Sequence, residues 1–175
     1  MSCVTVGRFK AGSNADLERT IAEAYVDEGR VVRKTTMVLG HTVEYLEAGD
    51  AAARPVVFCH GAAFSAHTWQ IMGALDAVAK AGFRALALNL PGYGASEKTI
   101  GSADGKTGFL ASFADALNLR SVFVVAASMG GSYAFPFVLS RHVAGFVTAA
   151  AVYPSTDFRG LPPTLAIYGE LLGKR

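Results

Sequence analysis

Several features that mark particular classes of protein are scarce in this sequence of 175 residues. It has only two cysteines, Cys3 and Cys59, so we expect neither a disulfide framework nor a zinc-binding cluster. Its 16 lysines and arginines exceed its 14 aspartates and glutamates by only two, which is not the basic excess of a nucleic-acid-binding domain. No apolar run reaches the roughly 18 residues of a membrane span. We therefore expect no metal, no nucleic acid and no membrane among its partners.

Targeting signals are missing from the first residues as well. They contain no apolar segment of a secretory signal, and five acidic residues between positions 16 and 28 disagree with a mitochondrial presequence. We expect a cytoplasmic location and leave a nuclear one open. Hydrophobic residues make up 51% of the chain, which is enough to build the buried core of one domain.

Residues 1–34 are predicted to form an N-terminal extension. A capping-box spacing precedes Leu17, Ile21 and Tyr25, which recur on one face of a helix. This pattern predicts a short amphipathic helix over residues 14–28. The helix either packs on the body of the protein or forms an arm.

From residue 35 to residue 175, apolar runs alternate with helical patterns. Strands that alternate with helices predict an α/β fold, with a mostly parallel sheet flanked by helices. The expected elements, in chain order, are a hairpin of strands 36–39 and 42–48, strand 55–59, helix 68–81, strand 83–90, helix 107–119, strand 121–127, helix 129–141, strand 143–152 and strand 164–168.

The sharpest functional signal is a serine at the end of a buried strand. Strand 121–127 is followed at once by Ser128, by Gly130 and by a helical pattern. In such a strand–turn–helix the serine takes a strained backbone conformation and its hydroxyl projects above the sheet. Ser128 is thus a candidate nucleophile, and the Met129 N–H at the helix N-terminus is a candidate oxyanion donor. The alternative is a serine that only caps the helix.

A second candidate donor follows strand 55–59. His60 and Gly61 end this strand, and Gly61 lets the chain turn so that the next backbone N–H, that of Ala62, faces the serine. Two backbone donors of this kind form an oxyanion hole. His60 is expected to hydrogen-bond neighbouring loops rather than to act as a base.

The substrate pocket is less well specified. Phe64, Tyr93 and Tyr153 follow strand ends, where they could line an apolar pocket with His60 and Gly61, although each ring fits the core equally well. Such a pocket suits an apolar acyl group. No Gly-rich loop opens a helix in the dinucleotide-binding pattern, so no cofactor is expected.

Three motifs together resemble those of the α/β-hydrolase superfamily: His60-Gly61, Asn89-Leu-Pro-Gly-Tyr-Gly94 and Ala126-Ala-Ser128-Met-Gly130. The second motif usually begins with aspartate in that superfamily, where this sequence has Asn89. A closer resemblance, over roughly residues 36–170, is to the small lidless α/β hydrolases of the domain-containing-protein-14 type. It implies an α/β-hydrolase fold and a serine hydrolase of esters or acyl groups, deacetylase-like, with Ser128 as nucleophile. Ala62 and Met129 would form its oxyanion hole. The group has also been linked to binding a protein partner.

The resemblance further implies an acid and a histidine after Ser128, and neither has a counterpart. The family's Gly-x-x-Asp reads Gly169-Glu170-Leu171-Leu172 here, so Leu172 stands at the position of the acid. All four histidines precede the expected position of the base: His41, His60, His67 and His142. We therefore expect a C-terminally truncated core, without the last strand and helices, and an impaired site.

Two hypotheses remain open on this evidence. The first is an esterase or acyl hydrolase that acts on a small acyl or ester substrate. The second is a non-catalytic member of the fold, a pseudoenzyme, that binds a protein or small-molecule partner. Dehalogenation and epoxide opening rank lowest, because the family's enzymes for these reactions use an aspartate where this chain has Ser128.

Overall fold

A computed structural model describes residues 31–98, 103–141, 143–151 and 161–167. The predicted helix 14–28, Tyr153, His142 and the segment 169–172 lie outside the described residues.

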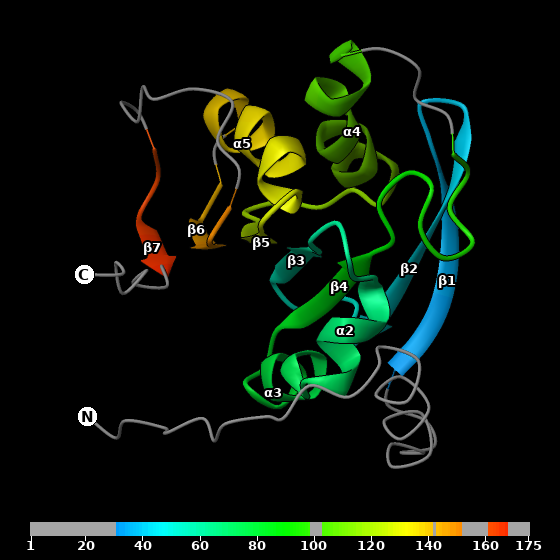
Figure 1. The fold of residues 1–175 in the computed structure, drawn as a ribbon. Coiled ribbons are helices and arrows are strands. Elements are labelled where there is room, and N and C mark those ends of the chain that lie inside the picture. Colours follow the sequence, from blue (N-terminus) through cyan, green and yellow to red (C-terminus); the bar gives the residue numbers. More distant parts are fainter. Residues whose placement is uncertain (1–30, 99–102, 142, 152–160, 168–175) are drawn as a thin grey trace, which may run out of the picture.

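Seven strands form one sheet in the order β1-β2-β4-β3-β5-β6-β7 (Figure 1). β2 runs antiparallel to both of its neighbours, and all pairs from β4 to β7 are parallel. This confirms the α/β-hydrolase fold, with its mostly parallel sheet. The strands are β1 (Val31–Val38), β2 (His41–Ala48), β3 (Pro55–Cys59), β4 (Arg84–Leu88), β5 (Phe123–Ala127), β6 (Gly145–Ala149) and β7 (Thr164–Ile167).

The hairpin of β1 and β2 turns at Leu39 and Gly40, whose φ angles of 51° and 80° are both left-handed. Two left-handed residues match the twist of the flanking strands. β1 begins earlier than the predicted strand, because it pairs with the whole of β2 and brings Val31 opposite Ala48. The added residues include Arg33 and Lys34, whose charged side chains interrupt the apolar pattern that would predict a strand.

Four helices are described: α2 (Ala66–Ile71), α3 (Ala74–Lys80), α4 (Ala103–Ala116) and α5 (Gly130–Ser140). The predicted helix 68–81 is divided into α2 and α3, because Gly73 between them has a left-handed φ of 71°. The helices predicted around α4 and α5 are present. None of the described helices is long and apolar enough to cross a membrane.

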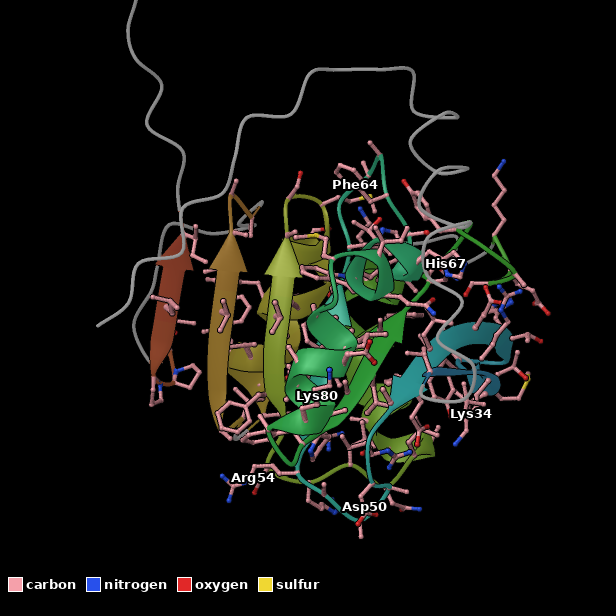
Figure 2. All side chains as sticks on the ribbon, turned by 90° about the horizontal axis from the view of Figure 1, so that it is seen from below. Lys34, Asp50, Arg54, Phe64, His67 and Lys80 are labelled. Atoms are coloured by element: carbon pink, nitrogen blue, oxygen red, sulfur yellow. The ribbon has the colours of Figure 1, made fainter. Side chains whose placement is uncertain are left out.

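The helices lie on the two faces of the sheet (Figure 1). Leu86 and Leu88 of β4 belong to the core beneath α4 and α5, whereas Ala85 and Ala87 belong to the core beneath α2 and α3. This alternation follows from the two-residue period of a strand. α2 and α3 cover β2, β3 and β4, and no described helix lies over β5, β6 and β7 on the same face (Figure 2).

Candidate active site

Ser128 lies on a sharp turn between β5 and α5. Its φ of 45° is left-handed, a conformation that costs a non-glycine residue about 1–3 kcal/mol. The surrounding backbone holds the turn: the Ser128 amide donates to the carbonyl oxygen of Ala149 at 3.1 Å, and the Gly131 amide donates to that of Ser128 at 3.0 Å. Ser128 is exposed. The strained backbone is thus anchored on both sides, and the residue it holds is open to solvent.

Small residues make this turn possible. A Cβ atom on Gly130 would lie 2.6 Å from the carbonyl oxygen of Cys59 and 2.8 Å from that of His60, both of them backbone atoms. A Cβ on Gly61 would lie 3.3 Å from the Cβ of Ser128. Glycine at both positions therefore lets α5 start against the end of β3 and lets the loop after β3 lie beside Ser128.

Two residues next to this turn, Ala62 and Met129, carry the candidate oxyanion donors. Met129 is the N-cap residue of α5, and Ala62 follows Gly61 in the loop after β3. Within the described residues, neither N–H donates to a protein acceptor. Unpaired backbone amides beside an exposed serine are the donor set that an oxyanion requires.

His60 is buried, with 1% of its surface exposed, and both of its ring nitrogens are engaged. The Leu90 amide donates to Nε2 at 3.0 Å, so Nε2 carries no proton. Nδ1 therefore carries it and donates to the carbonyl oxygen of Gly61 at 2.8 Å. Burial lowers the pKa of His60, and the bond to Gly61 opposes this in part. A neutral ring with two fixed bonds joins the loops after β3 and β4 and has no free nitrogen for a serine proton.

Tyr93, in the loop after β4, contacts the same region. Its hydroxyl donates to the carbonyl oxygen of Ala62 at 2.9 Å and lies 3.7 Å from the sulfur of Met129. Its ring meets that of His60 edge-on, with 4.6 Å between the centroids. Phe64, 53% exposed, lies at the ends of the strands (Figure 2). Loops after three neighbouring strands thus converge on Ser128.

Comparison with known proteins agrees with this geometry. The sequence model of the alpha/beta hydrolase family matches residues 56–174. The chain belongs to this family.

Curated relatives of this chain include proteins of the ABHD14 type. Rat (Rattus norvegicus) "Protein ABHD14A" is 39% identical over 125 residues, which are 66% of this chain and 52% of that protein. Rat "Putative protein-lysine deacylase ABHD14B" is 36% identical over 151 residues, which are 78% of this chain and 72% of that protein. This chain therefore spans about half the length of ABHD14A.

Solved structures share the fold of this chain. A predicted CIB-like hydrolase from Thermoplasma acidophilum superposes with a TM-score of 0.72 at 20% identity, over 79% of this chain and 73% of that one. The haloalkane dehalogenase DbeA from Bradyrhizobium elkani superposes with a TM-score of 0.64 at 29% identity, over 73% of this chain and 44% of that one.

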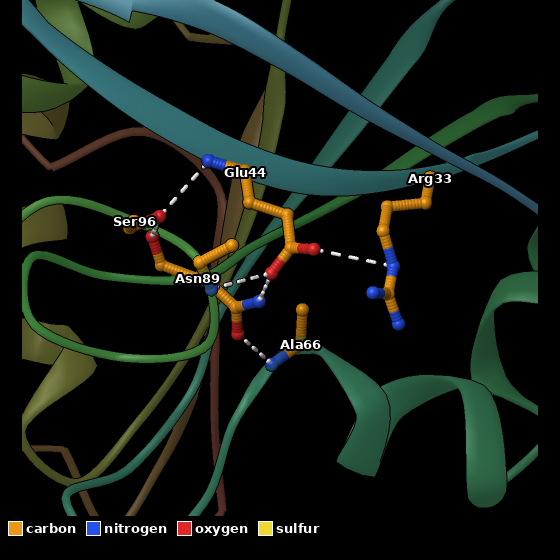
Figure 3. Close-up of polar contacts among 6 residues, drawn as sticks. Arg33, Glu44, Ala66, Asn89 and Ser96 are labelled. Atoms are coloured by element: carbon orange, nitrogen blue, oxygen red, sulfur yellow. Dashed lines mark hydrogen bonds and ion pairs between the residues drawn. The ribbon is translucent and has the colours of Figure 1, made fainter.

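The sequence analysis did not predict a buried carboxylate that lies behind the loops of the site. Glu44 of β2 is 4% exposed (Figure 3). It accepts hydrogen bonds from Asn89 Nδ2 and from the Ala95 amide, the latter at 2.9 Å, and pairs with Arg33 Nε at 3.2 Å. Asn89 Oδ1 in turn accepts the Ala66 amide at 2.8 Å. The network thereby connects β2 to the loop after β4 and to the start of α2.

The same network explains the departure from the family motif at position 89. The family usually has aspartate there, but an ionised aspartate has no hydrogen to donate to the carboxylate of Glu44, whereas the asparagine amide has. Ser96 completes the loop, because its hydroxyl donates to the carbonyl oxygen of Asn89 at 2.7 Å and accepts the Glu44 amide at 2.9 Å. A Cβ on Gly94 would collide with both Asn89 and Glu44. The one signal of this network in the sequence was the asparagine itself.

No base for Ser128 is found among the described residues. His67 lines a hollow of about 350 Å³ beside the start of α2, together with Arg33, Glu44 and Asn89. In this part of the chain no side chain hydrogen-bonds the Ser128 hydroxyl.

Alternative chemical centres are also missing from the described ranges. Cys59 is fully buried, and burial raises the pKa of its thiol to about 12, so it is not a reactive nucleophile. In the same ranges, no group of three or more His, Cys, Asp and Glu side chains could hold a metal ion.

Proposed function

We propose that this chain carries the nucleophile and the oxyanion hole of a serine hydrolase that acts on a small ester or acyl group. The observation that carries the proposal is the exposed Ser128 on its strained turn, with Gly61 against its Cβ and two unpaired amides nearby. The hydroxyl would attack the acyl carbon and lose its proton, and the leaving alcohol or amine would take a proton. Water would then release the acyl group.

Two interactions would stabilise the charge that develops in this attack. The amides of Ala62 and Met129 would donate to the carbonyl oxygen as it becomes negative, and each donor of this kind is worth about 10²–10³ in rate. The N-terminus of α5, which begins at Gly130, adds the positive end of the helix dipole.

The substrate class is proposed from the relatives and from the aromatic residues at the strand ends. The name of ABHD14B points to acyl groups on lysine side chains. Phe64 and Tyr93 would contact the acyl chain, with Tyr153 as a further candidate. An apolar acyl group on a small ester or on a lysine amine fits this set.

We propose that the site is impaired in this chain. The sequence has no histidine after His142, and Leu172 stands where the family has its acid. A serine without a base is a weak nucleophile. An oxyanion hole and substrate binding alone retain roughly 10³–10⁴-fold catalysis over water when a triad is removed in serine proteases.

A fluorophosphonate probe tests the proposal, because it bonds covalently to a serine hydroxyl that attacks phosphorus beside oxyanion donors. Since the site has no base, we expect the labelling to be slow. We expect labelling of the wild-type chain and none of Ser128→Ala. Ser121→Ala is the matched control: Ser121 is also exposed and has a left-handed φ of 48°, but it precedes β5, at the opposite end of the strand. Equal labelling of both variants, or none of the wild type at any concentration, contradicts the proposal.

The second candidate function is binding without catalysis. It is favoured by the lack of a base beside Ser128 in the described residues and by the engagement of both nitrogens of His60. A binding protein would retain its protein or small-molecule partner in Ser128→Ala, and the probe would not label it. Dehalogenation, the activity in the name of DbeA, fits less well because Ser128 occupies the position of the aspartate.

A further inference from the structure

Ala62 lies between two carbonyl groups that are both held by hydrogen bonds. The first, of Gly61, accepts His60 Nδ1–H at 2.8 Å and the Phe64 amide at 3.1 Å. In a trans peptide the C=O and the following N–H point in opposite directions. Fixing the oxygen of Gly61 therefore fixes the direction in which the Ala62 amide points, away from His60 and Phe64.

The second carbonyl group, that of Ala62 itself, accepts the hydroxyl of Tyr93 at 2.9 Å. Ala62 is exposed and has only a methyl side chain, so packing does little to restrain the peptide that follows it. Without the bond from Tyr93, rotation of this peptide would let the backbone at Ala62 move.

Tyr93 is itself firmly placed. Its amide donates to the carbonyl oxygen of Leu90 at 2.9 Å, and its own carbonyl oxygen accepts the Ser96 amide at 3.0 Å. Its ring packs edge-on against the buried ring of His60. The hydroxyl also lies 3.7 Å from the sulfur of Met129, the residue with the other candidate donor. One phenol thus touches both residues whose amides would bind an oxyanion.

We infer that Tyr93 is a positioning residue: its hydroxyl holds the Ala62 carbonyl and so, together with the two bonds to the Gly61 carbonyl, keeps the Ala62 amide in place to receive the oxyanion. The inference rests on the proposed function for its catalytic consequence. The anchoring of the backbone at Ala62 is a separate property and can be measured without any reaction.

Tyr93→Phe tests the inference, because it removes one oxygen atom and keeps the ring against His60. The matched control is Tyr45→Phe on β2, a buried tyrosine whose ring packs on Phe113. In the ¹⁵N-labelled chain, we expect the amide order parameters of Ala62 and Ala63 to fall from about 0.85 toward 0.6 in Tyr93→Phe only. Urea unfolding of each variant checks that the fold is intact.

Labelling by the fluorophosphonate probe supplies the catalytic readout. We expect the maximal labelling rate of Tyr93→Phe to fall about tenfold or more, up to the 10²–10³ of a lost donor. The probe concentration at half-maximal rate should stay unchanged, because the bond acts on the transition state. Tyr45→Phe should match the wild type in both.

The outcomes separate the inference from the function on which it rests. Order parameters that stay the same in Tyr93→Phe overturn the inference, and so does a more mobile Ala62 without slower labelling. A more mobile Ala62 in a protein whose wild type is never labelled supports the anchoring by Tyr93 and overturns the proposed function.

Discussion

The two halves of the sheet have similar apolar strands but differ in how they are covered. β2, β4 and β3 have helices on both faces, and Leu86 and Ala87 of β4 are both fully buried. Among the described helices, α5 packs against β5 and β6 on one face, and the other face of β5, β6 and β7 has no described helix over it (Figure 2). Val147 is accordingly half-buried, and Leu165 of β7 is 60% exposed. The candidate site lies where the halves meet, because its amide loop follows β3 and its serine follows β5.

The two edge strands of the sheet, β1 and β7, differ in the charged side chains that they carry. β1 carries Arg33 and Lys34, which form ion pairs with Glu44 and Glu47 of β2. β7 has the sequence Thr-Leu-Ala-Ile and no charged residue. Charged side chains on an edge strand discourage pairing with other chains. The described part of the chain is therefore protected against association at β1 and open to it at β7.

The largest expected difference between the halves is in the free energy of unfolding. Leu86→Ala in β4 should lower it by about 3 kcal/mol, because the substitution leaves a cavity between packed layers. Leu165→Ala in β7 makes the same chemical change on an exposed face and should cost under about 1 kcal/mol. Urea unfolding measures both variants. Equal losses would mean that β7 is as well packed as β4.

The buried network of Glu44 and Asn89 lies in the half of the sheet that has helices on both faces. It should not tolerate a second carboxylate. Asn89→Asp replaces the amide that donates to Glu44 and should cost about 2 kcal/mol at pH 7, the cost of a buried polar group without a partner. Glu44→Gln in the same chain restores a donor facing position 89 and should recover part of this loss. Chemical denaturation measures the free energy of unfolding of both variants. A double variant that is no more stable than Asn89→Asp alone would contradict the pairing of Asn89 with Glu44.

His60 should make the junction between the halves sensitive to acid. Burial lowers its pKa in the folded chain below the ordinary value of 6.5, so the unfolded chain binds more protons between the two values. Stability should therefore fall as the pH drops through about 6.5 and below, by at most about 1.4 kcal/mol per pH unit. His60→Gln, which does not titrate, should flatten the unfolding profile. The exposed His67→Gln is the control, and equal profiles for both variants contradict the assignment.

The strained turn at the end of β5 should respond to glycine. Ser128→Gly relieves the cost of a left-handed φ and should raise the free energy of unfolding by about 1 kcal/mol, after the entropy cost of glycine. Ser128→Ala keeps the strain and should not have this effect. A loss of stability in Ser128→Gly, measured by thermal unfolding, would show that the turn is not strained.

The smallest expected change in stability belongs to a variant of β7 whose main effect should be on self-association of the chain. The double variant Leu165→Lys/Ile167→Lys places two charges on the exposed edge strand β7. It should alter the free energy of unfolding by less than about 0.5 kcal/mol. In sedimentation experiments, the wild type should associate as its concentration rises, and the double variant should do so less. A wild type that stays monomeric at every concentration would contradict this view of β7.

Local patterns in the sequence predicted much of the fold and of the candidate site. Buried apolar runs located β3 to β7, and the strand–turn–helix around Ser128 follows from residues within ten positions of it. The prediction of one continuous helix over residues 68–81 was wrong at Gly73, because the apolar spacing continues across a residue that breaks the helix. β1 was predicted too short, because an edge strand with polar residues has no apolar alternation.

Long-range pairing explains what the sequence did not reveal. Glu44 and Asn89 are 45 positions apart, and they meet only because β2 pairs with β4. The contact of Tyr93 with Ala62 likewise joins two loops that are 31 positions apart. Neither pair has a spacing that a local pattern could detect, although the unusual asparagine of the Asn89 motif was visible.

The most direct test of the central claim is to locate the adduct of a fluorophosphonate probe on the intact chain by peptide mapping with tandem mass spectrometry. If the hydroxyl on the turn after β5 is the reactive group, the adduct will be on the peptide that contains Ser128, and Ser121 will stay unmodified. An adduct on another serine, or an unmodified Ser128 at saturating probe, would contradict the account.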